Sequence, residues 1–133
     1  MLRYVFIITF SSTIFSCTLF NNESINQMNS DELVEFVELN DAILLDVRTN
    51  DEFNSGHIEN SLNIDYFSDE FSINVDKLDK NIPIILYCRS GRRSGLSANK
   101  IKKLGFKEIY NLEGGVLEWI VQGNVVVFND NIN

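Results

Sequence analysis

The chain has 133 residues, of which 44% are hydrophobic, and a formal net charge of −8 at pH 7. This length suffices for one domain with a single core but not for two, and the apolar content is typical of a globular chain rather than a disordered one. The acidic balance argues against nucleic acid as a partner, because binding a phosphate backbone needs a basic surface.

The first twenty residues, MLRYVFIITFSSTIFSCTLF, have the pattern of an export signal. Arg3 supplies a positive charge, an apolar run of about ten residues follows, and a small residue precedes the expected cleavage point. A membrane-spanning helix needs roughly 20 apolar residues, whereas the uncharged run over residues 4–20 is slightly shorter and contains several hydroxyl groups. The pattern therefore favours a cleaved signal over an anchor helix that stays in place.

Residues 14–17 read Ile-Phe-Ser-Cys and resemble the lipid-attachment site of bacterial lipoproteins. In such a site the lipid is attached to the cysteine, here Cys17, and the signal before it is removed. We expect an export signal at residues 1–16, a lipidated Cys17 with a polar tether through residue 29, and a domain over residues 30–133. The lipid, or an uncleaved anchor in its place, would hold the domain on the periplasmic or extracellular side of a membrane.

Downstream of the tether, apolar patterns alternate between those of strands and those of helices. Residues 42–48 (AILLDVR) form a continuous apolar run, which is typical of a strand buried on both faces. Residues 67–78 instead place an apolar side chain every three or four positions, as an amphipathic helix does. The expected elements, in chain order, are an edge strand near residue 25, a helix at 30–40, strands at 42–48 and 61–64, a helix at 67–78, a strand at 82–88, a helix at 94–104, a strand at 108–112 and a helix at 116–121.

This alternation predicts a small α/β domain with a central parallel sheet, and the right-handed crossover rule places helices on both faces of the sheet. Ser30 is expected to cap the first helix, with Asp31 and Glu32 at the positive end of its dipole. The helix at 94–104 is expected to turn four apolar residues inward: Leu96, Ala98, Ile101 and Leu104.

Cys88 lies at the end of the strand at 82–88, and ligands of a parallel sheet bind at such strand ends. Gly91 permits a tight turn in the loop that follows, so that successive N–H groups converge at a helix N-terminus. The same loop contains three arginines: Arg89, Arg92 and Arg93. Amides and cations favour an anion, either the Cys88 thiolate or a bound substrate, and are expected to lower the pKa of the thiol. A lipid on Cys17 would leave Cys88 without a disulfide partner, as a candidate reactive thiol.

Three segments together resemble a single-domain rhodanese in their order and spacing: residues 44–64 (LLDVRTNDEFNSGHIENSLNI), 85–94 (ILYCRSGRRS) and 111–119 (NLEGGVLEW). The resemblance implies a rhodanese-like α/β fold and sulfurtransferase chemistry with no cofactor. Cys88 would attack a sulfane-sulfur donor such as thiosulfate, become a persulfide, and pass the sulfur to a thiol or to cyanide. The resemblance also implies that the loop after the cysteine binds substrate, through Arg89, Ser90, Gly91, Arg92, Arg93 and Ser94.

Two other functions stay open within this fold. Phosphatases and arsenate reductases of related fold have an arginine six residues after the cysteine, where this chain has Ser94, whereas Arg93 fits a loop one residue shorter. The shorter loop suits a sulfur-sized centre better than a tetrahedral phosphate, which favours the sulfurtransferase. Some rhodanese-like domains are non-catalytic binding modules, but these commonly lack the cysteine that this chain has.

The other polar residues near the strand ends are expected to support the site rather than to react. Asp46 and Arg48 end the first buried strand and fit either substrate positioning or a structural ion pair, with Glu52 as a further partner of Arg48. His57, the only histidine, could act as a base for Cys88, but the resemblance to rhodaneses implies a loop-fixing role, and a multi-histidine metal site is excluded. The glycine pair at 114–115 is expected to permit a tight turn beside the active site.

Overall fold

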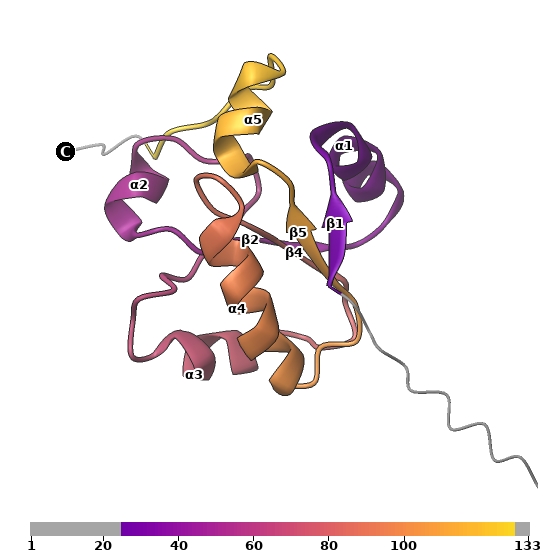
Figure 1. The fold of residues 1–133 in the computed structure, drawn as a ribbon, viewed down its shortest axis with the longest axis vertical. Coiled ribbons are helices and arrows are strands. Elements are labelled where there is room, and N and C mark those ends of the chain that lie inside the picture. The colour runs from indigo at the N-terminus through magenta and orange to yellow at the C-terminus, as the bar shows by residue number, and fades with distance from the viewer. Residues whose placement is uncertain (1–24, 130–133) are drawn as a thin grey trace, which may run out of the picture.

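The computed structural model describes residues 25–129, along which strands and helices alternate (Figure 1). The expected export signal and the expected lipid attachment at Cys17 lie outside the described residues. Between residues 25 and 129, no helix is long and apolar enough to cross a membrane. The elements are β1 (Asn26–Met28), α1 (Ser30–Leu39), β2 (Ile43–Asp46), α2 (Asn50–Asn54), β3 (Leu62–Asn63), α3 (Phe71–Asp76), β4 (Ile84–Tyr87), α4 (Arg92–Lys103), β5 (Ile109–Leu112) and α5 (Gly115–Val121).

The five strands form one parallel sheet in the order β1-β5-β4-β2-β3. Leu86 of the central strand β4 lies opposite Leu45 of β2 on one side and Asn111 of β5 on the other. The predicted α/β class with a central parallel sheet is confirmed, and the strand expected near residue 25 is the edge strand β1. Because parallel strands end at the same edge of a sheet, the loops that follow β2, β4 and β5 lie together at that edge.

Helices cover both faces of the sheet, because successive side chains of a strand point to opposite faces. Leu45 and Leu86 face α3 and α4 and form one core cluster, whose other members include Phe71, Val75, Ala98 and Ile101. Leu44 and Ile85 face the other way, toward α1 and α5, and cluster with Leu33, Val116 and Trp119. Cys88 belongs to the first cluster, so its side chain lies on the face that α4 crosses in Figure 1.

The helix expected at residues 67–78 is shorter than predicted at its start. α3 begins at Phe71, and Phe67 is 66% exposed instead of contributing to the core. The side chain of Asp65 accepts the backbone N–H of Phe67 at 2.9 Å, which fixes a turn at this point. Such local side-chain bonds compete with helix formation, so the apolar spacing alone was misleading here.

Capping boxes start two of the helices. In α1 the capping residue differs from the predicted one, and α2 was not predicted at all. Asn29, rather than Ser30, caps α1: its side chain accepts the N–H of Glu32, whose carboxylate accepts the N–H of Asn29. Thr49 and Glu52 make the same reciprocal pair at the start of α2, which the sequence analysis did not predict. With five residues, α2 is too short for a periodic pattern to reveal it.

α4 begins at Arg92 rather than at Ser94, because Gly91 has a left-handed φ of 92° and is the N-cap residue. Leu96, which was expected to face inward, is 49% exposed. The buried face of the helix consists of Ser94, Ser97, Ala98 and Ile101. The start of α4 therefore meets the sheet through small side chains, which allows it to lie close to the end of β4.

Candidate active site

Cys88 directly follows β4 and is only 1% exposed. Two donors contact its sulfur: the N–H of Gly91 lies 3.2 Å from Sγ and the hydroxyl of Ser94 lies 3.5 Å from it. Both donors belong to the first turn of α4 or its cap, so the positive end of this helix is directed at the sulfur. A thiolate is favoured in such a place, because it is anionic and only accepts hydrogen bonds.

Two opposing effects act on the pKa of Cys88. Burial raises the pKa, because burial disfavours the charged thiolate. Hydrogen bonds from the Ser94 hydroxyl and from the amides of Ser94, Ser90 and Gly91 lower it, and they outweigh burial, so the pKa lies below its ordinary value. A lowered pKa increases the fraction of thiolate near neutral pH.

The start of α5 holds the backbone of this loop from the other side. The N–H of Val116 donates to the Cys88 carbonyl at 2.9 Å, and the N–H of Leu117 donates to the Arg89 carbonyl at 3.1 Å. In a trans peptide the N–H points opposite to the carbonyl, so these bonds turn the following N–H groups away from α5 and into the loop. Gly115 makes this approach possible: at its φ of 58°, a Cβ would lie 2.4 Å from the Cys88 carbonyl oxygen.

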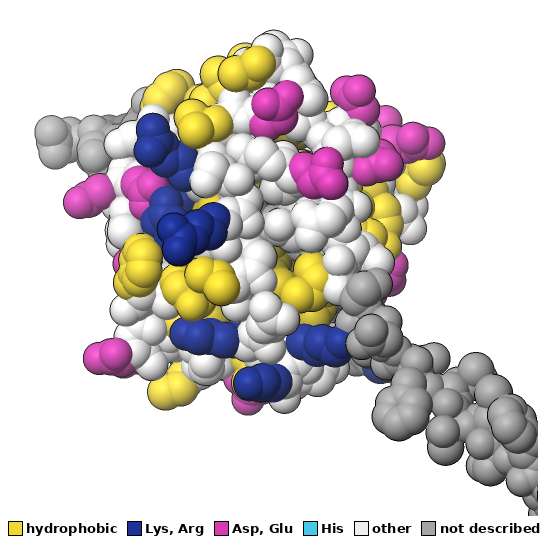
Figure 2. Space-filling model, viewed as in Figure 1, with side chains coloured by type: hydrophobic (Ala, Val, Ile, Leu, Met, Phe, Trp, Pro, Cys, Tyr) yellow, Lys and Arg dark blue, Asp and Glu magenta, His cyan; other side chains and the backbone are white. Residues whose placement is uncertain are grey.

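The three arginines of the loop differ in their surroundings. Arg89 and Arg92 are exposed, and within the described part of the chain neither side chain has an ion pair or hydrogen bond. Arg93 donates to both carboxylate oxygens of Glu52, at 2.7 and 2.6 Å. Figure 2 shows Lys and Arg side chains gathered at this end of α4, bordered by apolar side chains. The hydrogen bonds that lower the pKa of Cys88 come from Ser94 and the loop amides, whereas Arg93 interacts with the thiolate through its charge.

Asp46 and Arg48 form a buried ion pair at the end of β2, with exposed fractions of 0% and 6%. Nε and Nη2 of Arg48 donate to the Asp46 carboxylate at 2.6 to 3.0 Å, and Nη2 also donates to the Gly56 carbonyl at 2.7 Å. The side chain of Asn63 donates to the carbonyls of both residues. The expected pairing of Arg48 with Glu52 was wrong, because Asp46 and Gly56 occupy the guanidinium and Glu52 reaches Arg93 instead.

His57 is buried and fixes the end of α2 against the C-terminal segment. Its Nδ1 donates to the Phe53 carbonyl at 3.0 Å, and its ring stacks on the Phe53 ring with centroids 3.7 Å apart. Its backbone exchanges two hydrogen bonds with Val127, at 2.9 and 2.8 Å. None of these contacts involves Cys88, so the geometry gives His57 a loop-fixing position and no position as a base for the thiol.

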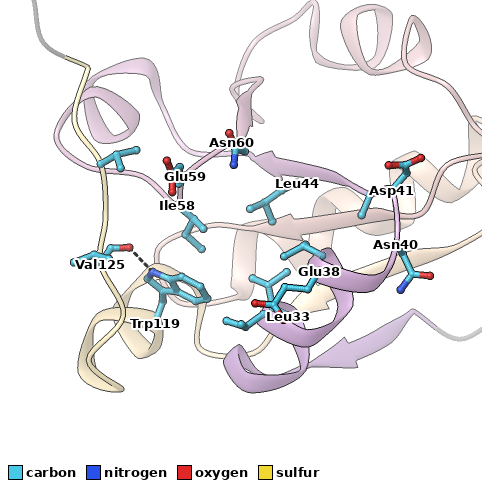
Figure 3. Close-up of a pocket in the computed structure, with 14 residues that line it drawn as sticks. Leu33, Glu38, Asn40, Asp41, Leu44, Ile58, Glu59, Asn60, Trp119 and Val125 are labelled. Atoms are coloured by element: carbon cyan, nitrogen blue, oxygen red, sulfur yellow. Dashed lines mark hydrogen bonds between the residues drawn. The ribbon is translucent and has the colours of Figure 1, made fainter.

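A pocket of about 430 Å³ opens on the face of the sheet that α1 and α5 cover (Figure 3). Its apolar wall includes Leu33, Leu44, Ile58 and Trp119, and the Trp119 ring N–H donates to the Val125 carbonyl beside it. Because Cys88 lies in the cluster on the opposite face, this pocket is not part of the site around the thiol.

A second pocket, of about 380 Å³, adjoins the cysteine loop. Arg89 lines it together with Val116 and Leu117, whose N–H groups hold the loop, and with Ile120 and Val126. Its lining also includes Arg48, Asp51 and Glu52, so it offers an apolar surface with charged groups of both signs beside the cysteine loop, although Cys88 itself does not line it.

No group of three or more His, Cys, Asp or Glu side chains within residues 25–129 could hold a metal ion. The contribution of the α5 amides to the site was not predicted from the sequence. The glycine pair at 114–115 was their one signal, and it indicated a turn without indicating which carbonyls the following N–H groups would reach.

The comparisons with known proteins agree with this fold. A model of the rhodanese-like domain family matches residues 29–122. Among curated proteins, the chain is similar to a tRNA uridine(34) hydroxylase of Hamiltonella defensa, with 31% identity over 97 residues, which are 70% of this chain and 27% of that protein. The chain spans 27% to 39% of the length of the curated relatives of this kind that it matches.

Two solved structures show the same architecture. A rhodanese-related protein from Thermoplasma volcanium is 29% identical, with a TM-score of 0.69, over 78% of this chain and 99% of that one. A rhodanese-like domain protein from Staphylococcus aureus is 26% identical, with a TM-score of 0.69, over 80% of this chain and all of that one (100%).

Proposed function

The chain belongs to the rhodanese-like domain family, and we propose that it is a sulfurtransferase whose Cys88 carries sulfur from a donor such as thiosulfate to a thiol or cyanide. The observation that carries this proposal is the set of contacts of the sulfur, which accepts the Gly91 N–H and the Ser94 hydroxyl in a loop that lowers the pKa of the thiol. Capture of sulfane sulfur requires a nucleophilic thiolate of this kind.

In the first half-reaction, the Cys88 thiolate attacks the outer sulfur of thiosulfate. A bond forms between Sγ and that sulfur, the sulfur–sulfur bond of thiosulfate breaks, and sulfite leaves with the electron pair. The persulfide that remains carries one negative charge on its outer sulfur. The amides that lower the pKa of the thiol, those of Ser90, Gly91 and Ser94, would stabilise that charge by donating hydrogen bonds to the outer sulfur.

In the second half-reaction, an acceptor thiolate or cyanide attacks the outer sulfur of the persulfide. The persulfide bond breaks, the electron pair returns to Sγ, and the thiolate is regenerated. The pocket beside the loop, lined by Arg89, Val116 and Leu117, would receive the remainder of an acceptor. Since Cys88 is 1% exposed, the attacking atom must stand at the end of a narrow group.

The exposed arginines, Arg89 and Arg92, are proposed to attract the doubly charged donor. Arg93 is less suited to grip a phosphate, because both of its terminal nitrogens donate to Glu52. That contact favours sulfur transfer over the phosphatase alternative. Hydroxylation of tRNA is also a weaker candidate, since the chain spans 27% to 39% of those relatives and carries a net charge of −8.

The test is mass spectrometry of the purified protein before and after incubation with thiosulfate. The peptide that contains Cys88 should gain the mass of one sulfur, and cyanide or a thiol should remove it. A Cys88→Ser variant is the control and should show neither change. Undiminished sulfur transfer by that variant would disprove the proposal, and a parent protein that never gains sulfur would favour the binding module.

We also propose that the protein is exported and tethered by lipid on Cys17, on the strength of Arg3, the apolar run and the Ile-Phe-Ser-Cys sequence. A Cys17→Ser variant should lose incorporation of labelled fatty acid and accumulate as an unprocessed precursor. Finding the parent protein mainly in the cytoplasm with its first residue intact would contradict this assignment.

A further inference from the structure

We infer that Asn111 is a positioning residue for Cys88, because its side-chain amide holds the Gly91 carbonyl and thereby keeps the Gly91 N–H directed at the sulfur. The inference deepens the proposed function. It rests on that function only because it concerns the reactivity of the same thiol. Asn111 is not among the residues that the sequence singled out, and it has no direct contact with the sulfur.

Asn111 lies in β5, next to the strand that leads to Cys88, and is 6% exposed. Its Nδ2 donates to the Gly91 carbonyl at 3.3 Å and to the Gln27 side chain at 3.1 Å. The amide therefore connects the sheet to the cap of α4, the same point from which an N–H reaches the thiol.

Gly91 joins the two halves of this arrangement. Its N–H donates to Sγ of Cys88, and its carbonyl accepts from the Gly95 N–H at 3.1 Å as well as from Asn111. Gly91 has a φ of 92°, and without a Cβ the residue itself does little to restrict its rotation. The orientation of the Gly91 backbone must therefore be fixed by contacts with other residues, and the side chain of Asn111 provides one such contact.

The orientation of Gly91 matters to the charge on the sulfur. Rotation of the Ser90–Gly91 peptide would replace the Gly91 N–H at the sulfur with the Ser90 carbonyl oxygen, which would repel a thiolate, whereas the N–H stabilises it. The Gly91 carbonyl belongs to the next peptide unit, so by binding it from the sheet side Asn111 restricts the backbone rotation of Gly91 and opposes loss of the contact between the Gly91 N–H and Sγ. The amide thus acts on the thiol through one intermediate residue.

The carbonyl oxygen of the Asn111 side chain indicates that a contribution to stability alone does not explain why an asparagine stands at this position. Its Oδ1 is buried and has no hydrogen-bond partner among residues 25–129. Leaving a buried acceptor unpaired is unfavourable, and an apolar side chain of similar shape would remove that cost. Such a side chain could not hold the Gly91 carbonyl, and the Gly95 N–H would remain as the partner of that oxygen.

The experiment compares Asn111→Leu with the parent protein in two measurements: the rate of Cys88 alkylation as a function of pH, and unfolding by denaturant. Peptide-resolved mass spectrometry separates Cys88 from Cys17. The leucine variant should be about as stable as the parent, while alkylation near neutral pH slows roughly threefold to tenfold and its pH midpoint rises, as expected for loss of a positioned hydrogen bond. Asn111→Gln, which keeps a side-chain amide, should retain part of the lost rate.

The matched control is Asn40→Leu, which also removes one amide-to-carbonyl hydrogen bond, to Phe36 at the end of α1. It should lower stability and leave the alkylation profile unchanged. An unchanged pH midpoint in Asn111→Leu, or in Asn111→Ala should the leucine variant not fold, would overturn the inference. Alkylation does not depend on sulfur transfer, so a parent protein that fails to take up sulfur would refute the proposed function and leave this result intact.

Discussion

The ends of β2 and β4 lie side by side in the sheet, yet their polar groups are arranged in opposite ways. At the end of β2, the Asp46 and Arg48 side chains are buried and bind each other, and Gly56 and Asn63 provide further partners. At the end of β4, the donors that reach the sulfur of Cys88 from the described residues are all neutral, and two nearby arginines have exposed guanidinium groups.

The difference separates structural polar groups from reactive ones. Two charged groups that form an ion pair with each other have few hydrogen-bonding sites left for a ligand. Removing one of them leaves the other as an unpaired buried charge, which strongly destabilises the fold. The negative charge of a thiolate surrounded by N–H and O–H donors is only partly compensated. An incoming anion can accept hydrogen bonds from the same donors. Charge at the β2 end should therefore affect stability, and donors at the β4 end should affect reactivity.

The largest effect is expected for Asp46→Asn, which removes one charge from the buried pair and leaves Arg48 uncompensated. The free energy of unfolding should fall by about 3–5 kcal/mol, as measured by denaturant titration. The exposed pair of Asp76 with Lys80 provides the control, because Asp76→Asn should change stability by less than about 1 kcal/mol. Equal losses in the two variants would mean that the β2 pair has no special structural role.

The second effect concerns the β4 end. Ser94→Ala removes the hydroxyl that donates to Sγ, so the pKa of Cys88 should rise and alkylation near neutral pH should slow by roughly tenfold, the equivalent of one pKa unit. Ser97→Ala is the control, since this buried hydroxyl donates to the Ser94 carbonyl instead. If both variants alkylate at the parent rate, the amides alone support the thiolate.

Glu52 connects the two ends, and a smaller effect is expected there. Hydrogen bonds from Arg93 lower the pKa of Glu52 from its ordinary value of 4.5 to about 2. A carboxyl whose pKa is lowered by folding stabilises the fold above its ordinary pKa, and this contribution is lost as the pH falls from about 4.5 to about 2. Because the pair is partly exposed, the contribution should be about 1 kcal/mol or less.

Glu52→Gln should accordingly flatten the dependence of unfolding free energy on pH in that window while leaving stability at pH 7 slightly lower. The same change releases Arg93 beside the loop and should increase the rate of sulfur capture. A pH dependence identical to that of the parent would show that the pair does not contribute to stability.

The smallest effect is expected for Arg92→Ala, with Arg89→Ala similar. Neither side chain has an ion pair or hydrogen bond to lose within the described part of the chain, so stability should not change. KM for thiosulfate should rise by about twofold, and the difference should shrink as salt is added. Lys77→Ala, which removes an exposed cation directly after α3, serves as the control. A KM that is equally sensitive to Lys77 would indicate attraction by overall charge rather than by the loop.

Much of the fold could be predicted from local patterns. Continuous apolar runs predicted β2 and β4, and the cysteine followed by a glycine and a helix start predicted the anion-binding loop. The partner of Glu52 could not be predicted, because Arg93 lies 41 positions away whereas Arg48 is close in sequence and equally suitable in charge. The short sequence separation of Arg48 and Glu52 was misleading, because the connections between the strands determine which side chains come into contact.

The contributions of the backbone were the hardest to predict. The amides of Val116 and Leu117 hold the loop, but any non-proline residue has such an amide, so no residue type marks them. Asn111 was hidden for a related reason, because one polar residue in an otherwise apolar strand has no pattern to which it belongs. The α5 amides and Asn111 both act on the loop after Cys88, and they come into contact with that loop only in the folded chain.

The bonds from α5 to the carbonyls of Cys88 and Arg89 make the reactive loop dependent on the last helix of the domain. A chain emerges from its amino end, from a ribosome or through a translocation channel, so β4 and its cysteine are present well before Gly115 is. Until the glycine pair closes its turn, those carbonyls have no α5 amides to bind and the loop lacks the arrangement that lowers the pKa of the thiol. We therefore expect the cysteine to become fully reactive only when synthesis of the domain is nearly complete, and an incomplete chain to carry a thiol with a more ordinary pKa.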